Sequence, residues 1–223
     1  MTTRRGSTQP VRKRLLRAAE KATLTRNPAQ IPRILTIGHS TRAIDEFIEL
    51  LRAHEVTRLV DVRTVPRSRH NPQFSRDELP ASLGTSGISY LHSPALGGLR
   101  RTNADSINTA WRNTSFRGYA DYMQTAEFNG AVDELIELSK HDRLALMCAE
   151  AVPWRCHRSL IADALLVRGI NSEDIRTPTQ RMPHRLTPFA RVRGTEITYP
   201  PQNLDSPAKA PQRRPSSKRV PKT

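Results

Sequence analysis

Short apolar runs alternate with amphipathic segments along the middle of the chain. Four runs have the length and composition of buried strands: Arg33–Gly38, Arg58–Val62, Ile88–Leu91 and Leu144–Met147. Apolar residues at helical spacing follow them and predict helices over Ile44–Leu51, Tyr119–Met123, Phe128–Leu138 and Arg158–Arg168. Alternating strands and helices favour an α/β fold, a mainly parallel sheet of four to five strands with helices on both faces. We expect a single domain.

Two segments show neither a strand nor a helix period. Arg63–Phe74 contains two prolines and is expected to be a loop. Leu96 is followed by Gly97 and Gly98, which permit unusual backbone, and the stretch Arg100–Arg117 lacks periodicity. A long irregular loop is predicted there, and long loops in compact domains are often functional.

Charge divides the chain into three parts. The formal net charge is +15 and the sequence pI is about 11.0. Residues 1–30 carry eight bases and one acid, and residues 203–223 carry six bases and one acid. We therefore predict a basic N-terminal tail at 1–30, disordered or forming a short helix, an α/β domain at 31–180, and at 181–223 an irregular extension with a basic, proline-rich disordered tail.

Basic tails fit a polyanionic partner, because each phosphate contact releases a counterion irrespective of sequence. DNA or RNA is therefore a candidate partner. No run is apolar enough to span a membrane, and the first thirty residues lack a signal-peptide centre, so a cytoplasmic location without membrane contact is expected. Two cysteines make no disulfide framework and are expected to be buried, reactive or metal-binding thiols. Nothing in the sequence predicts an oligomeric state.

Six ordered motifs lie within this α/β pattern. They are TIGHS (Thr36–Ser40), DVR with a nearby P-x-S (Asp61–Arg63, then Pro66 and Ser68), Tyr90 followed by LGG (Leu96–Gly98), YADYM (Tyr119–Met123), MCAE (Met147–Glu150) and CHR (Cys156–Arg158). Over roughly residues 35–176 the chain resembles the bacterial and archaeal family called domain of unknown function 488. The resemblance implies an α/β domain with these motifs gathered together, and it implies no established reaction.

Three chemically active residues follow predicted strands directly. They are His39, Arg63 and Cys148. Ligands of open parallel sheets bind at the carboxyl ends of the strands, so these residues are expected to face one crevice.

Cysteine chemistry is the first candidate for this crevice. Cys148 has Glu150 near it, and Cys156 is followed by His157 at the start of a predicted helix, whose N-terminus would lower a thiol pKa. We expect Cys148, Glu150 and His157 to be catalytic, with Cys148 favoured over Cys156 as nucleophile. The alternative is that Cys148 is a small buried hydrophobic residue.

A metal is the second candidate. Cys148, Cys156 and His157, with His39 or His92, could bind zinc or iron, although their spacing is not that of a close-paired metal motif. No other cofactor is predicted.

Anion binding is the third candidate. Guanidinium groups make bidentate contacts with phosphate or carboxylate, and helix N-termini favour anions. The expected anion-binding residues are Arg63, Arg67, Arg158, His39 and Ser40. The alternative is that these arginines pair with Asp61 or Glu150 and leave the pocket neutral. Tyr90 could stack on a ring or belong to the core.

Two functions therefore remain open. The first is a crevice that binds an anionic, phosphate-bearing or nucleic-acid ligand and carries out cysteine chemistry. The second is a non-enzymatic nucleic-acid-associated protein, such as a repair or regulatory accessory, that uses its basic tails.

Overall fold

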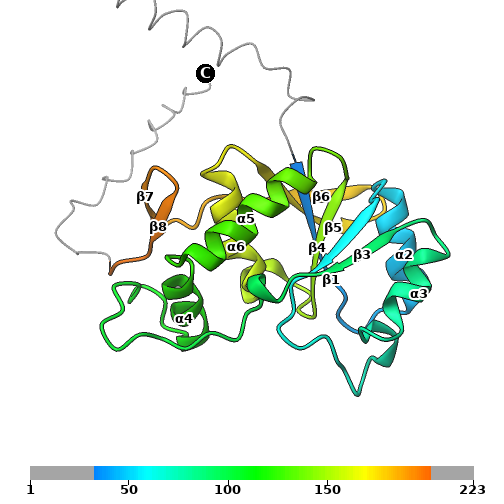
Figure 1. The fold of residues 1–223 in the computed structure, drawn as a ribbon, viewed down its shortest axis with the longest axis horizontal. Helices are drawn as coiled ribbons and strands as arrows, with labels where there is room; N and C mark the ends of the chain where they lie inside the picture. Colours follow the sequence, from blue (N-terminus) through cyan, green and yellow to red (C-terminus); the bar gives the residue numbers. More distant parts are fainter. Residues whose placement is uncertain (1–32, 202–223) are drawn as a thin grey trace, which may run out of the picture.

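A six-stranded sheet forms the centre of the molecule (Figure 1). The computed structural model describes residues 33–201. The sheet has the order β3-β2-β4-β1-β5-β6, and every neighbouring pair is parallel except β5 and β6. The strands are β1 (Arg33–Gly38), β2 (Arg58–Asp61), β3 (Ser89–His92), β4 (Leu144–Cys148), β5 (Asn171–Thr177) and β6 (Gln180–Pro183).

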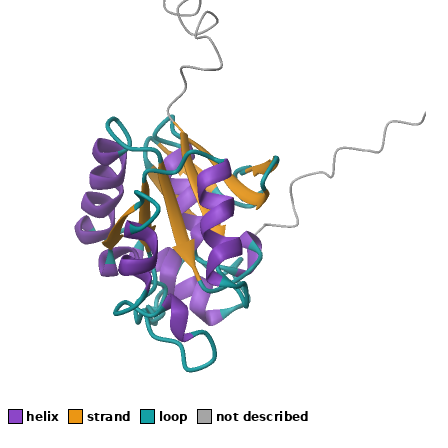
Figure 2. Ribbon diagram, turned by 90° about the vertical axis from the view of Figure 1, so that its right-hand side faces the viewer, coloured by secondary structure: helices purple, strands orange, loops and turns teal. Residues whose placement is uncertain are grey.

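Helices cover both faces of this sheet (Figure 2). They are α2 (Ile44–Ala53), α3 (Leu79–Gly84), α4 (Thr114–Tyr122), α5 (Ala126–Leu138) and α6 (Arg158–Leu166). Three short 3-10 helices, η2 (Pro72–Phe74), η3 (Pro94–Leu96) and η4 (Pro153–Arg155), lie in the connections. Helices α2 and α3 pack on one face, and α4, α5 and α6 belong to the core of the other face.

The apolar runs arise because the central strands are buried on both faces. In β4, Leu144 and Leu146 face the core that contains α5 and α6, while Ala145 and Met147 face the core that contains α2. Successive side chains of a strand point to opposite faces, so a strand between two helical layers must be apolar at every position. Cys148 ends β4 on the α5 and α6 side.

The α/β fold class predicted from the sequence is confirmed, and the sheet is larger at one edge. Strand β5 has the sequence NSEDIRT and β6 has QRMP, and neither is an apolar run. Both extend the sheet beyond β1, where β6 turns back antiparallel to β5. Edge strands need less apolar surface than central ones, so periodicity alone does not reveal them.

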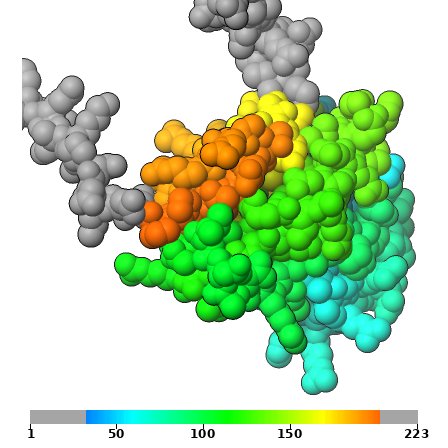
Figure 3. Space-filling view, turned by 60° about the vertical axis from the view of Figure 1, so that its left-hand side comes forward, coloured from blue at the N-terminus to red at the C-terminus, as the bar shows by residue number. Residues whose placement is uncertain are grey.

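The segment after residue 181 is also more regular than the irregular extension expected there. It contains the end of β6 and a two-stranded hairpin, β7 (Arg191–Arg193) and β8 (Glu196–Thr198). Figure 3 shows this segment, in orange, lying against the green middle of the chain. Ile197 and Tyr199 are buried in the core beside α6.

Asp163 of α6 holds this C-terminal segment in place. The Tyr199 hydroxyl donates to Asp163 Oδ2 at 2.8 Å, and the backbone N–H of Thr187 donates to Asp163 Oδ1 at 3.1 Å. His184 Nε2 lies 2.7 Å from the same Oδ1. A buried carboxylate needs such partners, so Asp163 and the segment depend on each other.

Residues 1–32 and 202–223 lie outside the described part of the chain. The predicted basic tails, and their contact with DNA or RNA, fall almost entirely within them and stay predictions. Among residues 33–201, none of the helices combines the length and apolarity needed to cross a bilayer.

Replacing Tyr199 with Ala should detach the C-terminal segment. The substitution removes a fully buried ring and the hydrogen bond to Asp163, so the free energy of unfolding should fall by about 3–5 kcal/mol. Urea unfolding measures this change, and limited proteolysis should show faster cleavage between residues 184 and 201. Val192→Ala, at an exposed position of β7, is the control and should change stability by no more than about 0.5 kcal/mol. A loss below about 1 kcal/mol in Tyr199→Ala would contradict the anchoring role.

Candidate active site

Three neighbouring strands bring the predicted residues to one edge of the sheet. Strands β2, β4 and β1 are adjacent and parallel, so their carboxyl ends lie side by side. His39, Arg63 and Cys148 follow or end these strands, and all three line a cleft of about 710 Å³. The loop of residues 149–157 forms a further wall, and we call this space the thiol cleft.

Gly38 allows the strand end and this loop to approach each other. The backbone N–H of His39 donates to Cys148 O, and that of Ser40 donates to Ala149 O, both at 2.9 Å. These bonds continue the β1–β4 ladder past the strands. A Cβ atom on Gly38 would lie 1.9 Å from Glu150 O, which no side chain tolerates. The TIGHS motif therefore needs glycine for close backbone packing.

Arg63 is held by a buried ion pair. Its Nε donates to Asp61 Oδ1 at 2.8 Å, and its Nη2 donates to Asp61 Oδ2 at 2.6 Å. The Nη2 group also donates to Phe74 O at 2.6 Å, and the Tyr90 hydroxyl donates to Asp61 Oδ2 at 2.8 Å. Arg63 is 6% exposed and Asp61 is fully buried. Asp61 therefore balances the charge of Arg63. This is the alternative that the sequence left open, in which an arginine pairs with Asp61.

His39 is neutral in this setting. Its Nδ1 lies 2.8 Å from Ser40 O and its Nε2 lies 3.2 Å from Arg63 Nη1. Nδ1 therefore carries the proton and donates, while Nε2 accepts from the guanidinium. Burial, together with the nearby charge of Arg63, lowers the pKa of His39 to about 4. Both ring nitrogens are occupied, so His39 positions Arg63 instead of adding positive charge.

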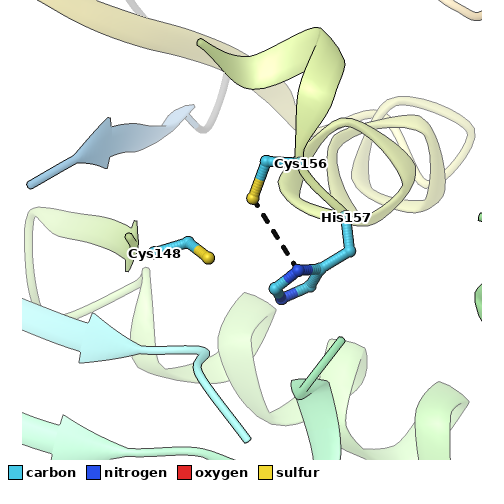
Figure 4. A group of neighbouring side chains, drawn as sticks. All are labelled: Cys148, Cys156 and His157. Carbon is cyan, nitrogen blue, oxygen red and sulfur yellow. Dashed lines mark hydrogen bonds between the residues drawn. The ribbon is translucent and has the colours of Figure 1, made fainter. Parts of the chain in front are cut away.

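Two thiols and an imidazole that line the thiol cleft lie next to one another (Figure 4). Cys148 comes from the end of β4, and Cys156 and His157 come from the residues just before α6. One ligand atom from each of the three residues lies within 4.8 Å of the others. Both cysteines are buried and neither is in a disulfide.

The hydrogen bonds of His157 determine how its ring faces the sulfur. His157 Nε2 lies 2.9 Å from Val62 O, so Nε2 carries a proton and donates to this carbonyl. Nδ1 then points to Cys156 Sγ at 3.7 Å, where it can take the thiol proton. This is the cysteine and histidine arrangement that activates a thiol for attack.

The two thiols have opposite acidities. A hydrogen bond from Cys148 lowers the pKa of Cys156 well below its usual value, and the contacts with His157 and the charge of Arg158 lower it further. The same hydrogen bond and burial raise the pKa of Cys148. Of the two thiols, Cys156 is therefore the one that ionises more readily, although burial opposes this. The sequence favoured Cys148 as nucleophile, whereas this geometry favours Cys156.

Gly98 fixes the position of the His157 ring. A Cβ atom on Gly98 would lie 2.5 Å from His157 Nδ1. Tyr119 also packs against His157, and the centres of the two rings are 5.1 Å apart. Gly97 is equally constrained, because a Cβ there would lie 2.6 Å from the Thr64 hydroxyl. The LGG motif therefore supports the imidazole and the cleft wall.

The remaining predicted residues divide into two groups. Ser40, Arg67 and Glu150 line the thiol cleft. Arg158 does not line it: the side chain is fully buried, with Nη1 at 3.1 Å from Asp174 Oδ1 and Nη2 at 2.6 Å from Glu150 O. Arg158 acts on the cleft through the loop that it holds and through its charge.

Arg155 is a cleft residue that the sequence did not single out. It is exposed and lines the thiol cleft beside Cys156. Within residues 33–201, neither Arg155 nor Arg67 forms a salt bridge. The sequence signal that could have identified Arg155 is its position one residue before the CHR motif.

The thiol and imidazole group is also compact enough to hold a metal ion. Cys148, Cys156 and His157 supply two sulfurs and a nitrogen, donor atoms that suit zinc. His157 already donates its other ring nitrogen to a carbonyl, which is the usual support of a metal-bound histidine. His39 and His92 are not part of the group.

The comparison with protein families agrees with the motifs. Residues 43–165, more than half of the chain, match the family model described as Domain of unknown function DUF488. The chain belongs to this family. Searches of curated proteins and of solved structures gave no match. The DUF488 region includes Arg63, the LGG motif, both cysteines and His157, whereas Gly38 and His39 lie just before it.

Gly98→Ala should disturb the thiol pair of this DUF488 protein without unfolding it. The new Cβ displaces the His157 ring, Cys156 loses its partner, and its pKa rises. Alkylation of Cys156 by iodoacetamide near neutral pH should slow about three- to tenfold, as followed by peptide mass spectrometry. Gly130→Ala in α5 is the matched control, because a Cβ there meets no atom within 4 Å. An unchanged rate in Gly98→Ala would show that His157 does not activate Cys156.

Proposed function

We propose that this protein is a cysteine-dependent enzyme that acts on an anionic substrate in the thiol cleft, with Cys156 as the nucleophile. The observation that carries the proposal is the Cys156 sulfur, 3.7 Å from His157 Nδ1, in a cleft with two arginines that have no acidic partner within residues 33–201. A thiolate is the reactive form of cysteine, so its stabilisation at neutral pH supports catalysis.

Cys148 is a positioning residue in this proposal. It lies beside the Cys156 sulfur, and the interaction of the two thiols favours ionisation of Cys156 over that of Cys148. The Glu150 backbone favours the ionised form of Cys148 and offsets this effect only in part. Loss of Cys148 should therefore leave a nucleophile that is present but less acidic.

Arg67 and Arg155 supply the attraction for an anion. The other two arginines near the cleft are paired with Asp61 and Asp174. Arg67 and Arg155 are exposed, so their guanidinium groups can make bidentate contacts with a phosphate or carboxylate. The negative charge of Glu150 partly offsets them, which leaves a modest preference for anions.

The reaction step follows from the Cys156 and His157 pair. The Cys156 thiolate attacks the electrophilic atom of the substrate, a bond from sulfur to that atom forms, and the bond to the leaving group breaks. The leaving group takes the proton that His157 accepted from the thiol. Water then hydrolyses the covalent intermediate: its hydroxyl goes to the product, and its remaining proton returns to the Cys156 and His157 pair.

Zinc binding is the second candidate function. It rests on the Cys148, Cys156 and His157 group, because two cysteines and one histidine form a known catalytic zinc set that leaves a fourth position for water or substrate. Bound zinc would act as a Lewis acid. The same sulfur would then be a ligand instead of a nucleophile.

Alkylation kinetics separate these functions. Cys156 should react with iodoacetamide with an apparent pKa well below the ordinary thiol value of about 8.5, and a chelator should not change the rate. Cys148 should stay slow. A Cys156 that reacts only after chelation would support zinc, and two thiols that stay inert in both conditions would contradict both functions.

The anion preference can be read from the same reaction. Iodoacetate is negatively charged and iodoacetamide is neutral, so the ratio of their rates at Cys156 reports the attraction of the cleft for anions. Arg67→Ala combined with Arg155→Ala should lower this ratio up to about fivefold, because exposed charges contribute about 1 kcal/mol or less. Arg69→Ala, an exposed arginine of the same loop that does not line the cleft, is the control. An unchanged ratio in the double variant would contradict the anion site.

A further inference from the structure

A second cavity lies on the other side of the segment that carries Cys156. Its volume is about 590 Å³, within the range of small-molecule sites. Pro153 and Trp154 line this cavity, whereas Arg155, Cys156 and His157 line the thiol cleft. The remaining walls come from β5, β6, the start of α6 and the chain around Phe189. We call it the tryptophan cavity, because both tryptophans of the chain line it.

Four buried polar atoms around the tryptophan cavity have no hydrogen-bond partner among residues 33–201. They are Trp111 Nε1, Arg158 Nε, Ser172 Oγ and Asp174 Oδ2. The side chains of Arg158, Ser172 and Asp174 are each more than nine-tenths buried. Asp174 Oδ2 has only an ion-pair contact, 3.5 Å from Arg176 Nη1. Buried polar groups are normally satisfied, so these atoms are the polar partners that the cavity offers to a ligand. They have almost no exposed surface, so a ligand reaches them only when the side chains that cover them shift.

The other walls are flat and apolar. Trp111 is held by aromatic contacts with Phe116, Phe189 and Tyr199, at 4.7 to 5.5 Å between ring centres. Trp154 is 59% exposed, and the guanidinium of Arg176 lies 5.3 Å from the centre of its ring. The cavity therefore has one fixed aromatic wall and one exposed aromatic side chain that a ring could stack on.

The polar atoms restrict the ligand to one chemical class. Two N–H groups require an acceptor, the Asp174 oxygen requires a donor, and the serine hydroxyl serves either role. An acyl chain would fill the apolar space and leave all four atoms unpaired. A charged head group would disturb the balance of the buried Arg158–Asp174 pair. A neutral flat ring whose edge both donates and accepts meets every requirement.

We propose that the tryptophan cavity binds a nucleobase, held by stacking on its tryptophans and by hydrogen bonds to Arg158, Ser172 and Asp174. The base comes either from a free nucleoside or from the end of a nucleic-acid strand. Arg158 also holds Glu150 O in the wall of the thiol cleft, so a bound base contacts the residue that links the two sites.

Tryptophan fluorescence of the full chain tests this proposal directly. Both tryptophans line the cavity, so the whole intrinsic signal reports on it. Adenosine, guanosine, cytidine and uridine are titrated with excitation at the red edge of the tryptophan band, where the bases absorb little, and calorimetry repeats each titration. At least one nucleoside should change the fluorescence saturably. No saturable binding of any nucleoside up to millimolar concentration, or binding of a long-chain fatty acid alone, would overturn the proposal.

Two variants locate the binding. Ser172→Ala removes one hydrogen-bonding group and should weaken binding about three- to tenfold. Trp154→Ala removes the exposed ring and should weaken it about five- to a hundredfold, followed by the fluorescence of Trp111. Ser86→Ala, far from both cavities in the turn after α3, is the matched control and should bind normally. Binding that survives both cavity variants unchanged would place the base elsewhere and overturn the proposal.

The source of the base and the independence of the two sites are read in parallel. A short single-stranded oligonucleotide that ends in the preferred base is compared with the free nucleoside, and the tighter ligand identifies the source. Alkylation of Cys156 by iodoacetamide reports on the thiol cleft alone. A normal alkylation profile without nucleoside binding refutes only this inference, and nucleoside binding with an inert Cys156 refutes only the cysteine enzyme.

Discussion

The guanidinium of Arg63 joins the segments from which the candidate active site is built. It binds Asp61 at the end of β2, His39 after β1 and the carbonyl of Phe74 in the loop beyond. Asp61 in turn accepts a hydrogen bond from Tyr90 of β3. Removing one partner of a buried pair typically costs about 3–5 kcal/mol, so this network constrains the edge of the sheet strongly. Because Arg63 is paired with Asp61, it attracts an anionic ligand only weakly.

This constraint leaves the chemistry to the opposite side of the cleft. The β1–β4 backbone ladder continues to Ser40 and Ala149 and brings Cys148 under the loop that carries Cys156. The carbonyl of Val62, between the two members of the Asp61–Arg63 pair, accepts a hydrogen bond from His157 Nε2. The ion pair therefore positions the imidazole indirectly, and the imidazole faces the Cys156 sulfur.

The sequence predicted the parts of this arrangement that depend on local pattern. The buried strands were recognisable because they are apolar at every position, and the strand ends that carry His39, Arg63 and Cys148 followed from them. The polar strands β5 and β6 at one side of the sheet, and the hairpin that Tyr199 anchors, have no such pattern. The sequence offered Asp61 as a partner for the arginines but could not decide the pairing. Only the fold shows that Arg63 pairs with Asp61 and Arg158 with Asp174. The choice between two cysteines also depended on which one His157 faces.

The thiolate itself is the most direct test of this account. Ultraviolet absorbance of the thiolate, followed against pH in the wild type and in Cys156→Ser, counts the ionised sulfurs and assigns them. The account predicts one thiolate at neutral pH that disappears in Cys156→Ser, while Cys148 ionises only in strongly alkaline solution. A wild-type protein without thiolate absorbance until the pH passes the ordinary thiol value of about 8.5 would contradict it.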